Sequence, residues 1–226
     1  MPKKKKITQI QNRFRIDVPD KNVWESALER VYGIFMRADH VNVAFSGGKD
    51  STVVLELCDM VAKHLNRRFS VIFFDEEIID PDTEQYLLDV YNRPDANYDF
   101  HWMCFQMRHT LRSTRRSHWY TWDQDEKDVW FRDPPEWAVQ EYPGVDAKTY
   151  VGRMSHQYLS AILENAKDKK IANLLGIRSA EAFNRLRSVM SKGGCQPEKL
   201  DEWGPGLHIF HPIYDWKDND VWLAIK

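Results

Sequence analysis

The sequence AFSGGKDS, residues 44–51, joins an apolar run to an amphipathic one and contains two adjacent glycines and a lysine. Residues 41–45 have the composition of a buried strand, and the apolar positions in residues 53–65 recur at helical spacing. In a turn between a parallel strand and a helix, backbone N–H groups point beyond the sheet, and adjacent glycines let an anion approach closely. The helix start adds a partial positive charge and Lys49 adds a full one. The stretch therefore predicts a binding site for phosphate, pyrophosphate or sulfate, called the anion seat below.

This turn is not a Walker A loop, which would need a glycine in place of Val43 and a serine or threonine in place of Asp50. The hydroxyls of Ser46 and Ser51 can donate further hydrogen bonds to an anion. The competing interpretation is an ordinary glycine turn whose lysine faces water. The strand before the turn and the helix after it favour the anion seat.

The periodicity along the rest of the chain predicts an α/β fold. Residues 23–37 predict a helix before the glycine turn. After it we expect a helix ending near residue 67, a strand at 69–75, a helix at 81–92 and a strand at 97–103. The later part predicts a helix at 150–167, a strand at 171–175, a turn at Gly176, a helix carrying Glu181, Arg185 and Arg187, a strand at 207–213 and the start of a helix at 216–226. This order is typical of a Rossmann-like parallel sheet with helices on both faces, which binds ligands beyond the carboxyl ends of its strands.

Length and composition indicate a single domain over residues 23–226, preceded by a basic arm at 1–22. Residues 104–150 are irregular and rich in arginine and tryptophan, so we expect an insertion or lid rather than a sheet element. The net charge of −2 excludes a global field that would hold the chain on nucleic acid or a membrane, and no apolar run is long enough to span a bilayer. Three widely spaced cysteines without a CxxC motif argue against disulfides, a zinc site or an iron–sulfur cluster within this chain, and they fit the cytoplasm.

SGGKDS is the signature of the PP-loop adenine-nucleotide α-hydrolase superfamily, which this chain resembles over about residues 23–226. The superfamily includes ATP pyrophosphatases, the small subunit of ATP sulfurylase and phosphoadenosine phosphosulfate (PAPS) reductases. GIRSAEAFNR, residues 176–185, and HPIYDWKDNDVW, residues 211–222, resemble elements of the PAPS reductase branch. WMCFQMRHTLRS, residues 102–113, and WDQDEKDVWFR, residues 122–132, are similar to a subgroup typified by the regulator IbrA, which is found beside a ParB/sulfiredoxin-like protein.

The resemblance implies the Rossmann-like fold of the HUP and adenine nucleotide α-hydrolase class, and a site that binds ATP or PAPS together with Mg²⁺. In the ATP case an acceptor attacks the α-phosphorus and pyrophosphate leaves, whereas in the PAPS case a thiol attacks the sulfur. Either reaction would belong to sulfur metabolism or to nucleic-acid modification. Together, the residue pattern and the resemblance predict a nucleotide site made of Ser46, Gly47, Gly48, Lys49, Asp50, Ser51, Asp75, Gly176, Arg178 and Arg185, with Lys49 and Arg178 in the catalytic roles.

Several of these residues have a second interpretation. Asp50 either caps the helix or binds Mg²⁺. Asp75, at the end of a predicted strand, suits a ribose hydroxyl or a metal ion. Arg178 is expected to grip phosphate oxygens, whereas Arg185 can equally be solvated or paired with Glu181.

The chain lacks the Glu-Cys-Gly-hydrophobic-His motif that carries the nucleophilic cysteine of PAPS reductases. Cys104, after the third predicted strand, and Cys195, in a glycine-rich loop, are the thiol candidates, and Cys58 is expected in the core. Thiol-dependent reduction would therefore need one of the two candidates, a partner protein, or a motif beyond Lys226 in a longer protein.

An alternative function is a regulator that binds nucleotide without turning it over and acts on a ParB/sulfiredoxin-like partner or on DNA. The segment 108–122 would serve it, because arginines along one face of a helix, followed by aromatic rings, suit single-stranded nucleic acid. A lid that is packed by its own aromatic side chains and paired with the acidic residues at 123–128 explains the same segment. His208 and His211, three apart on a predicted strand, do not form a chelating pair.

Overall fold

The computed structural model describes residues 22–110, 118–141, 168–192 and 203–226. Three predicted features lie outside these ranges: the basic arm over residues 1–22, apart from Asn22, the helix at 150–167, and the loop that carries Cys195. The insertion expected at 104–150 is described in part, over residues 104–110 and 118–141.

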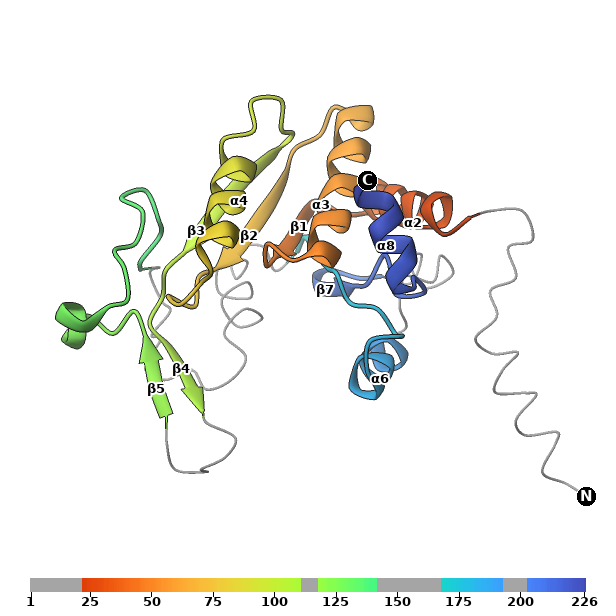
Figure 1. Ribbon diagram of the computed structural model, residues 1–226. Coiled ribbons are helices and arrows are strands. Elements are labelled where there is room, and N and C mark those ends of the chain that lie inside the picture. The colour runs from red at the N-terminus through yellow and green to blue at the C-terminus, as the bar shows by residue number, and fades with distance from the viewer. Residues whose placement is uncertain (1–21, 111–117, 142–167, 193–202) are drawn as a thin grey trace, which may run out of the picture.

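Five parallel strands form the central sheet, in the order β3-β2-β1-β6-β7 (Figure 1). Their bounds are β1 His40–Phe45, β2 Phe69–Phe74, β3 Tyr98–Met103, β6 Lys170–Leu175 and β7 Gly206–Phe210. β1 pairs with β2 on one side and with β6 on the other, so the strand order reverses direction at β1. In open parallel sheets a ligand binds outside the carboxyl ends of the strands at this switch point. The predicted α/β, Rossmann-like fold is confirmed.

The helices are α2 (Val23–Arg37), α3 (Lys49–Leu65), α4 (Pro81–Tyr91), α6 (Phe183–Lys192) and α8 (Asp218–Ile225). Capping residues mark the start of two of these helices. Asn22 and Glu25 form a reciprocal capping box at α2, and Asp80 caps α4 with Pro81 as its first residue. None of the described helices combines the length and the apolar composition that a membrane crossing requires.

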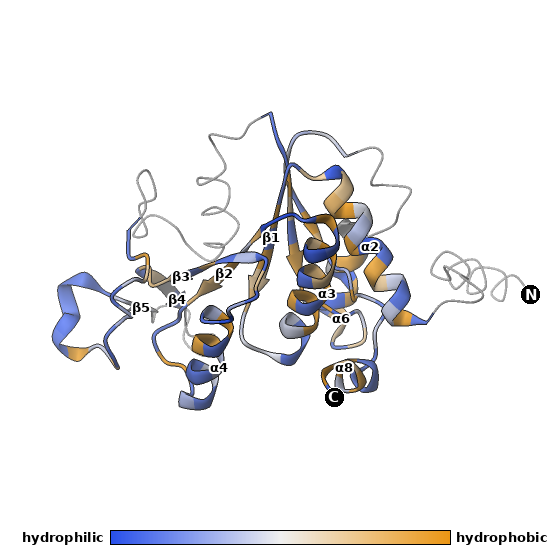
Figure 2. Cartoon of the chain, turned by 90° about the horizontal axis from the view of Figure 1, so that it is seen from above, coloured by the Kyte–Doolittle hydropathy of each residue, from blue (hydrophilic) through white to orange (hydrophobic). Residues whose placement is uncertain are grey.

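The apolar core lies on the side of the sheet that α3 and α4 cover (Figure 2). Val41, Val43 and Phe45 alternate along β1 with more polar positions, and all three are buried in one cluster with apolar residues of α2 and α3. On the other face of β1, Asn42 is aligned with Ser70 of β2 and Asn173 of β6, and all three are buried. The apolar face therefore anchors α3, whose first turn borders the glycine loop.

The insertion contains a sheet element that the sequence did not predict. β4 (Met107–Thr110) and β5 (His118–Thr121) form a separate antiparallel pair, followed by a 3₁₀ helix, η1, at Gln124–Val129. The expectation of a lid without strands is therefore wrong, and so is the helical arrangement considered for Arg108, which lies on β4. Cross-strand contacts stabilise the pair, such as the stacked rings of His109 and Trp119, whose centroids lie 5.1 Å apart. Figure 1 shows this hairpin projecting beyond the main sheet.

Several predicted boundaries shift by a few residues. α3 ends at Leu65, before the left-handed residue Asn66, rather than near residue 67. α6 begins at Phe183, so Glu181 precedes the helix that was expected to carry it. β7 ends at Phe210, which places His211 in the following loop.

Candidate functional site

The glycine loop lies at the carboxyl end of β1 and leads directly into α3. Gly47 has φ of 73°, and a Cβ added there would lie 3.1 Å from the Thr83 side chain, so glycine is needed for both reasons. Gly48 is the N-cap of α3, without a side chain that could satisfy the first amides of the helix. Those amides have no preceding helical carbonyl to bond, which makes the turn a natural anion-binding element.

Two serine hydroxyls fix the shape of the loop. Ser51 Oγ donates to the Gly48 carbonyl oxygen at 2.8 Å and accepts from the Ser46 amide at 3.3 Å. The hydroxyls of Ser46 and Ser51 are 3.1 Å apart, and Ser46 Oγ also accepts from the Gly48 amide at 3.4 Å. Ser51 is buried, whereas Ser46 is exposed. Ser51 therefore holds the loop in shape, and Ser46 is the more exposed of the two serines.

Gly176 supports the loop from the neighbouring strand. It follows β6, and a Cβ added there would lie 2.7 Å from the carbonyl carbon of Asp50 and 2.7 Å from the amide nitrogen of Ser51. Both are backbone atoms, which cannot rotate away as the tip of a side chain can. The glycine therefore allows β6 to pack directly against the first turn of α3.

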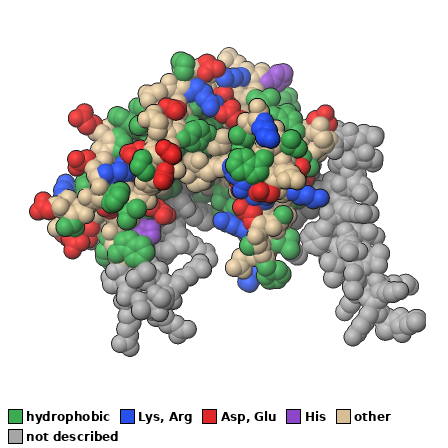
Figure 3. Space-filling view, viewed as in Figure 1, with side chains coloured by type: hydrophobic (Ala, Val, Ile, Leu, Met, Phe, Trp, Pro, Cys, Tyr) green, Lys and Arg blue, Asp and Glu red, His purple; other side chains and the backbone are tan. Residues whose placement is uncertain are grey.

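Four charged side chains from three segments meet beside this turn. Arg178 Nε donates to Asp50 Oδ1 at 2.7 Å, and one of its NH groups lies 3.1 Å from Asp218 Oδ1 on α8. Lys49 Nζ lies 3.2 Å from the same Asp218 oxygen and 3.8 Å from Asp50 Oδ2. Figure 3 shows basic and acidic side chains lying side by side over α3 and α8. Lys49 and Arg178, predicted to act together, are thus brought to one point, where carboxylates balance their charges.

Arg185 lies at the margin of this cluster. Its side chain is 52% exposed on α6, and its nearest ion pair is with Glu181 at 3.7 Å. Glu181 also lies 3.8 Å from Arg178, so it links the two arginines. The side chain is thus both partly solvated and paired with Glu181, and a contact of Arg185 with phosphate stays a prediction.

The structure contradicts the capping interpretation of Asp50. Gly48 is the N-cap of α3, and the Asp50 carboxylate binds Arg178 instead. In the part of the chain that the structure describes, no group of three or more His, Cys, Asp or Glu side chains could hold a metal ion. Mg²⁺ in nucleotide sites commonly takes one or two carboxylates and completes its coordination with phosphates and water. The carboxylate of Asp50, in the first turn of α3 next to the loop, fits that supporting role.

Asp75 is at the end of β2 as predicted, but its carboxylate has no exposed surface. Its oxygens accept from the Trp102 indole at 2.6 Å, from the Glu77 amide at 2.8 Å and from the Arg132 guanidinium. The structure therefore does not support the expected contact of Asp75 with a ribose or a metal ion. Nothing in the sequence pattern indicated that Asp75 pairs with Arg132, which lies 57 residues away in the insertion.

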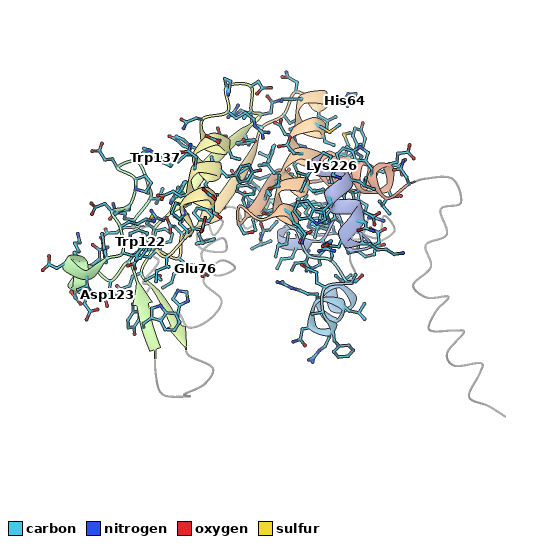
Figure 4. All side chains as sticks on the ribbon, viewed as in Figure 1. His64, Glu76, Trp122, Asp123, Trp137 and Lys226 are labelled. Carbon is cyan, nitrogen blue, oxygen red and sulfur yellow. The ribbon has the colours of Figure 1, made fainter. Side chains whose placement is uncertain are left out.

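Asp75 and its neighbour Glu77 instead fasten the insertion to the sheet. The Glu77 carboxylate accepts from the Trp122 amide at 2.8 Å and from the Phe131 amide at 2.9 Å. Arg132 also pairs with Glu84 of α4 at 3.2 Å. In Figure 4, Trp122 lies close to Glu76, next to the end of β2. The insertion is thus held by charges at the carboxyl edge of the sheet, the edge that carries the glycine loop.

Cys104 is buried, and its thiol lies 3.6 Å from Asp75 Oδ2. Burial, followed by the negative charge of Asp75, raises the pKa of the Cys104 thiol far above its usual range. A nucleophilic cysteine needs a lowered pKa and access to its substrate, so Cys104 is not a candidate nucleophile. Cys58 is buried, as expected, and Cys195 lies outside the described residues.

Asp218 is the site residue that sequence reasoning missed. Lys49, followed by Arg178, holds the pKa of the Asp218 carboxyl below its usual range. The Trp222 ring, one turn further along α8, has its centroid 6.0 Å from Lys49 Nζ. The segment HPIYDWKDNDVW had marked the region, but nothing in the local pattern indicates which of its acidic residues meets Lys49.

A comparison with protein-family models identifies one domain over most of the chain. The family model described as phosphoadenosine phosphosulfate reductase domain matches residues 40–226, a range that includes the glycine loop, Gly176 and Arg178. The chain is 29% identical over 219 residues to the Escherichia coli (strain K12) protein named uncharacterized protein YbdN, aligning 92% of this chain with 52% of that one. It therefore spans about half the length of that relative. The narrower IbrA-like subgroup stays a prediction.

Two solved structures show a distant likeness of fold. The U34-tRNA thiolase NcsA from Methanococcus maripaludis has a TM-score of 0.47 and 14% identity, over 89% of this chain and 62% of that one. The PAPS reductase from Candida auris, solved as a phosphate complex, has a TM-score of 0.44 and 12% identity, over 88% of this chain and 78% of that one.

Proposed function

Because the chain belongs to the phosphoadenosine phosphosulfate reductase domain family, we propose that it is an enzyme that binds an adenine nucleotide, ATP or PAPS, at the carboxyl edge of β1. The observation that carries this proposal is the pre-shaped loop at residues 46–51, with Lys49 and Arg178 meeting beside it. A loop already fixed by its own serine hydroxyls has less conformational entropy to lose when an anion binds.

In the ATP version of the reaction, an acceptor attacks the α-phosphorus while the bond to the bridging oxygen breaks. The electron pair of that bond leaves with pyrophosphate, and the amides of the loop and the Lys49 ammonium stabilise the developing negative charge. Arg178 adds a second cation, and Ser46 offers an exposed hydroxyl. Mg²⁺, when bound with the nucleotide, would neutralise part of the phosphate charge. The contribution of the protein is positioning and charge stabilisation.

The ATP version is favoured over the PAPS version by the chemistry of the described cysteines. Attack on the sulfur of PAPS needs a reactive thiolate, and Cys58 and Cys104 are both buried. The PAPS reaction would therefore depend on Cys195, on a thiol of a partner protein or on a thiol elsewhere in a longer chain. We place the reaction in sulfur metabolism or in the modification of nucleic acid.

Calorimetry with ATP, PAPS and adenosine bisphosphate, each with and without Mg²⁺, tests the nucleotide preference. Lys49→Ala is expected to weaken nucleotide binding by about tenfold or more, since it removes a charge-assisted contact. Lys127→Ala, which removes an exposed lysine on η1, is the matched control and should leave affinity unchanged. Equal affinities in the wild type and in Lys49→Ala would refute the proposed site.

Release of radiolabelled pyrophosphate from ATP then separates an enzyme from a regulator. Release that depends on Lys49 supports catalysis at the α-phosphate. Tight ATP binding without turnover, in the presence of candidate acceptors, would instead favour the regulator that acts with a ParB/sulfiredoxin-like partner or DNA. Sulfite formation from PAPS with a thiol reductant would favour the reductase.

A further inference from the structure

A single carboxylate oxygen connects the two cations of the proposed site. Asp218 Oδ1 lies 3.2 Å from Lys49 Nζ and 3.1 Å from a terminal nitrogen of Arg178. A carboxylate oxygen between an ammonium and a guanidinium is in the environment that a phosphate or sulfate oxygen would occupy. The position of Asp218 therefore marks a point at which these two cations can hold an anion together.

The surroundings of Arg178 restrict how a ligand can reach it. The Arg178 side chain is only 5% exposed, among the carboxylates of Asp50, Glu181 and Asp218. Asp50 is fixed in the first turn of α3 and is itself 15% exposed. Asp218 is 61% exposed, at the start of the short helix α8. Glu181, 3.8 Å from the same guanidinium, is 28% exposed. Of the three carboxylates, Asp218 is therefore the most exposed and the one that can move into solvent and leave a contact of Arg178 open.

Asp218 is not needed to begin α8. The Asp220 carboxylate accepts from the Lys217 amide at 2.7 Å and so supplies the capping contact of this helix. The contacts of Asp218 are directed at the cations of the other segments, together with the Trp222 side chain of its own helix. A role in the site explains this arrangement better than a role in starting the helix.

We propose that the Asp218 carboxylate competes with an anionic group of the ligand for Lys49 and Arg178, and that the ligand displaces it on binding. This inference rests on the proposed function. It adds Asp218 as a residue that sets the affinity of the site for anions and limits which anions can bind. A multiply charged group that also accepts hydrogen bonds from the loop amides can displace one carboxylate. A singly charged anion makes weaker contacts with the two cations and is a poorer competitor. The site would thus favour pyrophosphate-like groups over simple monoanions.

The test measures the affinity of inorganic pyrophosphate at constant ionic strength for four forms of the full chain. Asp218→Asn should bind pyrophosphate about three- to tenfold more tightly than the wild type, the range expected when two ion pairs of one largely exposed carboxylate no longer compete. Asp218→Glu keeps the charge and should stay close to the wild type. Asn is accepted at helix starts, and thermal unfolding of each variant checks that the fold is intact.

Asp82→Asn is the matched control for a general effect of charge. Asp82 is exposed at the start of α4, next to Thr83, whose side chain borders Gly47. The Asp82→Asn substitution removes the same charge near the loop, and the Asp82 side chain is not one of the ion-pair partners of Lys49 or Arg178. An equal gain in Asp82→Asn, or an unchanged or weaker affinity in Asp218→Asn, would overturn the competition. If the wild type and every variant fail to bind pyrophosphate, it is the proposed function that fails, and this inference falls with it.

Discussion

In a Gly176→Ala variant, the new methyl group would lie 2.7 Å from the carbonyl carbon of Asp50 and from the amide nitrogen of Ser51. Real Cβ atoms do not approach backbone atoms so closely, so either β6 or the first turn of α3 must shift. Forcing an extra methyl group into a packed site costs about 1–3 kcal/mol. For a chain of this size each kcal/mol lowers Tm by about 2–4 °C, so we expect a fall of roughly 2–12 °C. Thermal unfolding followed by circular dichroism measures it.

The same shift should disturb the anion seat, because the displaced atoms belong to the amides at the start of α3. We therefore expect Gly176→Ala to weaken pyrophosphate binding as well as to lower Tm. Gly204→Ala is the matched control, since a Cβ there meets nothing within 4 Å. The packing argument would be refuted if both variants melted within about 1 °C of each other and bound pyrophosphate equally.

Three further substitutions or modifications test other parts of the structure. Arg132→Met should lower the free energy of unfolding in urea by about 3–5 kcal/mol, because it leaves the buried Asp75 without its ion pair; a loss below about 1 kcal/mol would contradict that pairing. Gly47→Ala should lose about 1–2 kcal/mol from left-handed strain, while Gly48→Ala, at φ −80°, should lose less. Cys104 should resist iodoacetamide at pH 8 in the folded protein and react after denaturation, because its raised pKa and burial suppress the thiolate; mass spectrometry of the native digest would reveal an unexpected adduct.

The sequence predicted the elements whose signal is local. Apolar runs and helical spacing located β1, α2, α3 and β2 closely, and the paired glycines with Lys49 located the loop. It failed where a short pattern is ambiguous, as at β4 and β5, whose four-residue sequences, MRHT and HWYT, are too short to show the alternation of a strand. These strands are stabilised by pairing with each other across residues 111–117, and such pairing is invisible to a local window.

The sequence by itself determined the strand–glycine turn–helix unit, because backbone geometry and the burial period are encoded within a few neighbouring residues. Only the tertiary structure decided the partners of the charged groups. Arg178 meets Asp50 across 128 residues and Asp75 meets Arg132 across 57, since the strand order places β6 beside β1 and places β3, which leads into the insertion, beside β2. Whether a carboxylate faces a ligand, as expected for Asp75, or is buried against an arginine depends on which segments the sheet places next to it, and charge alone does not encode that choice.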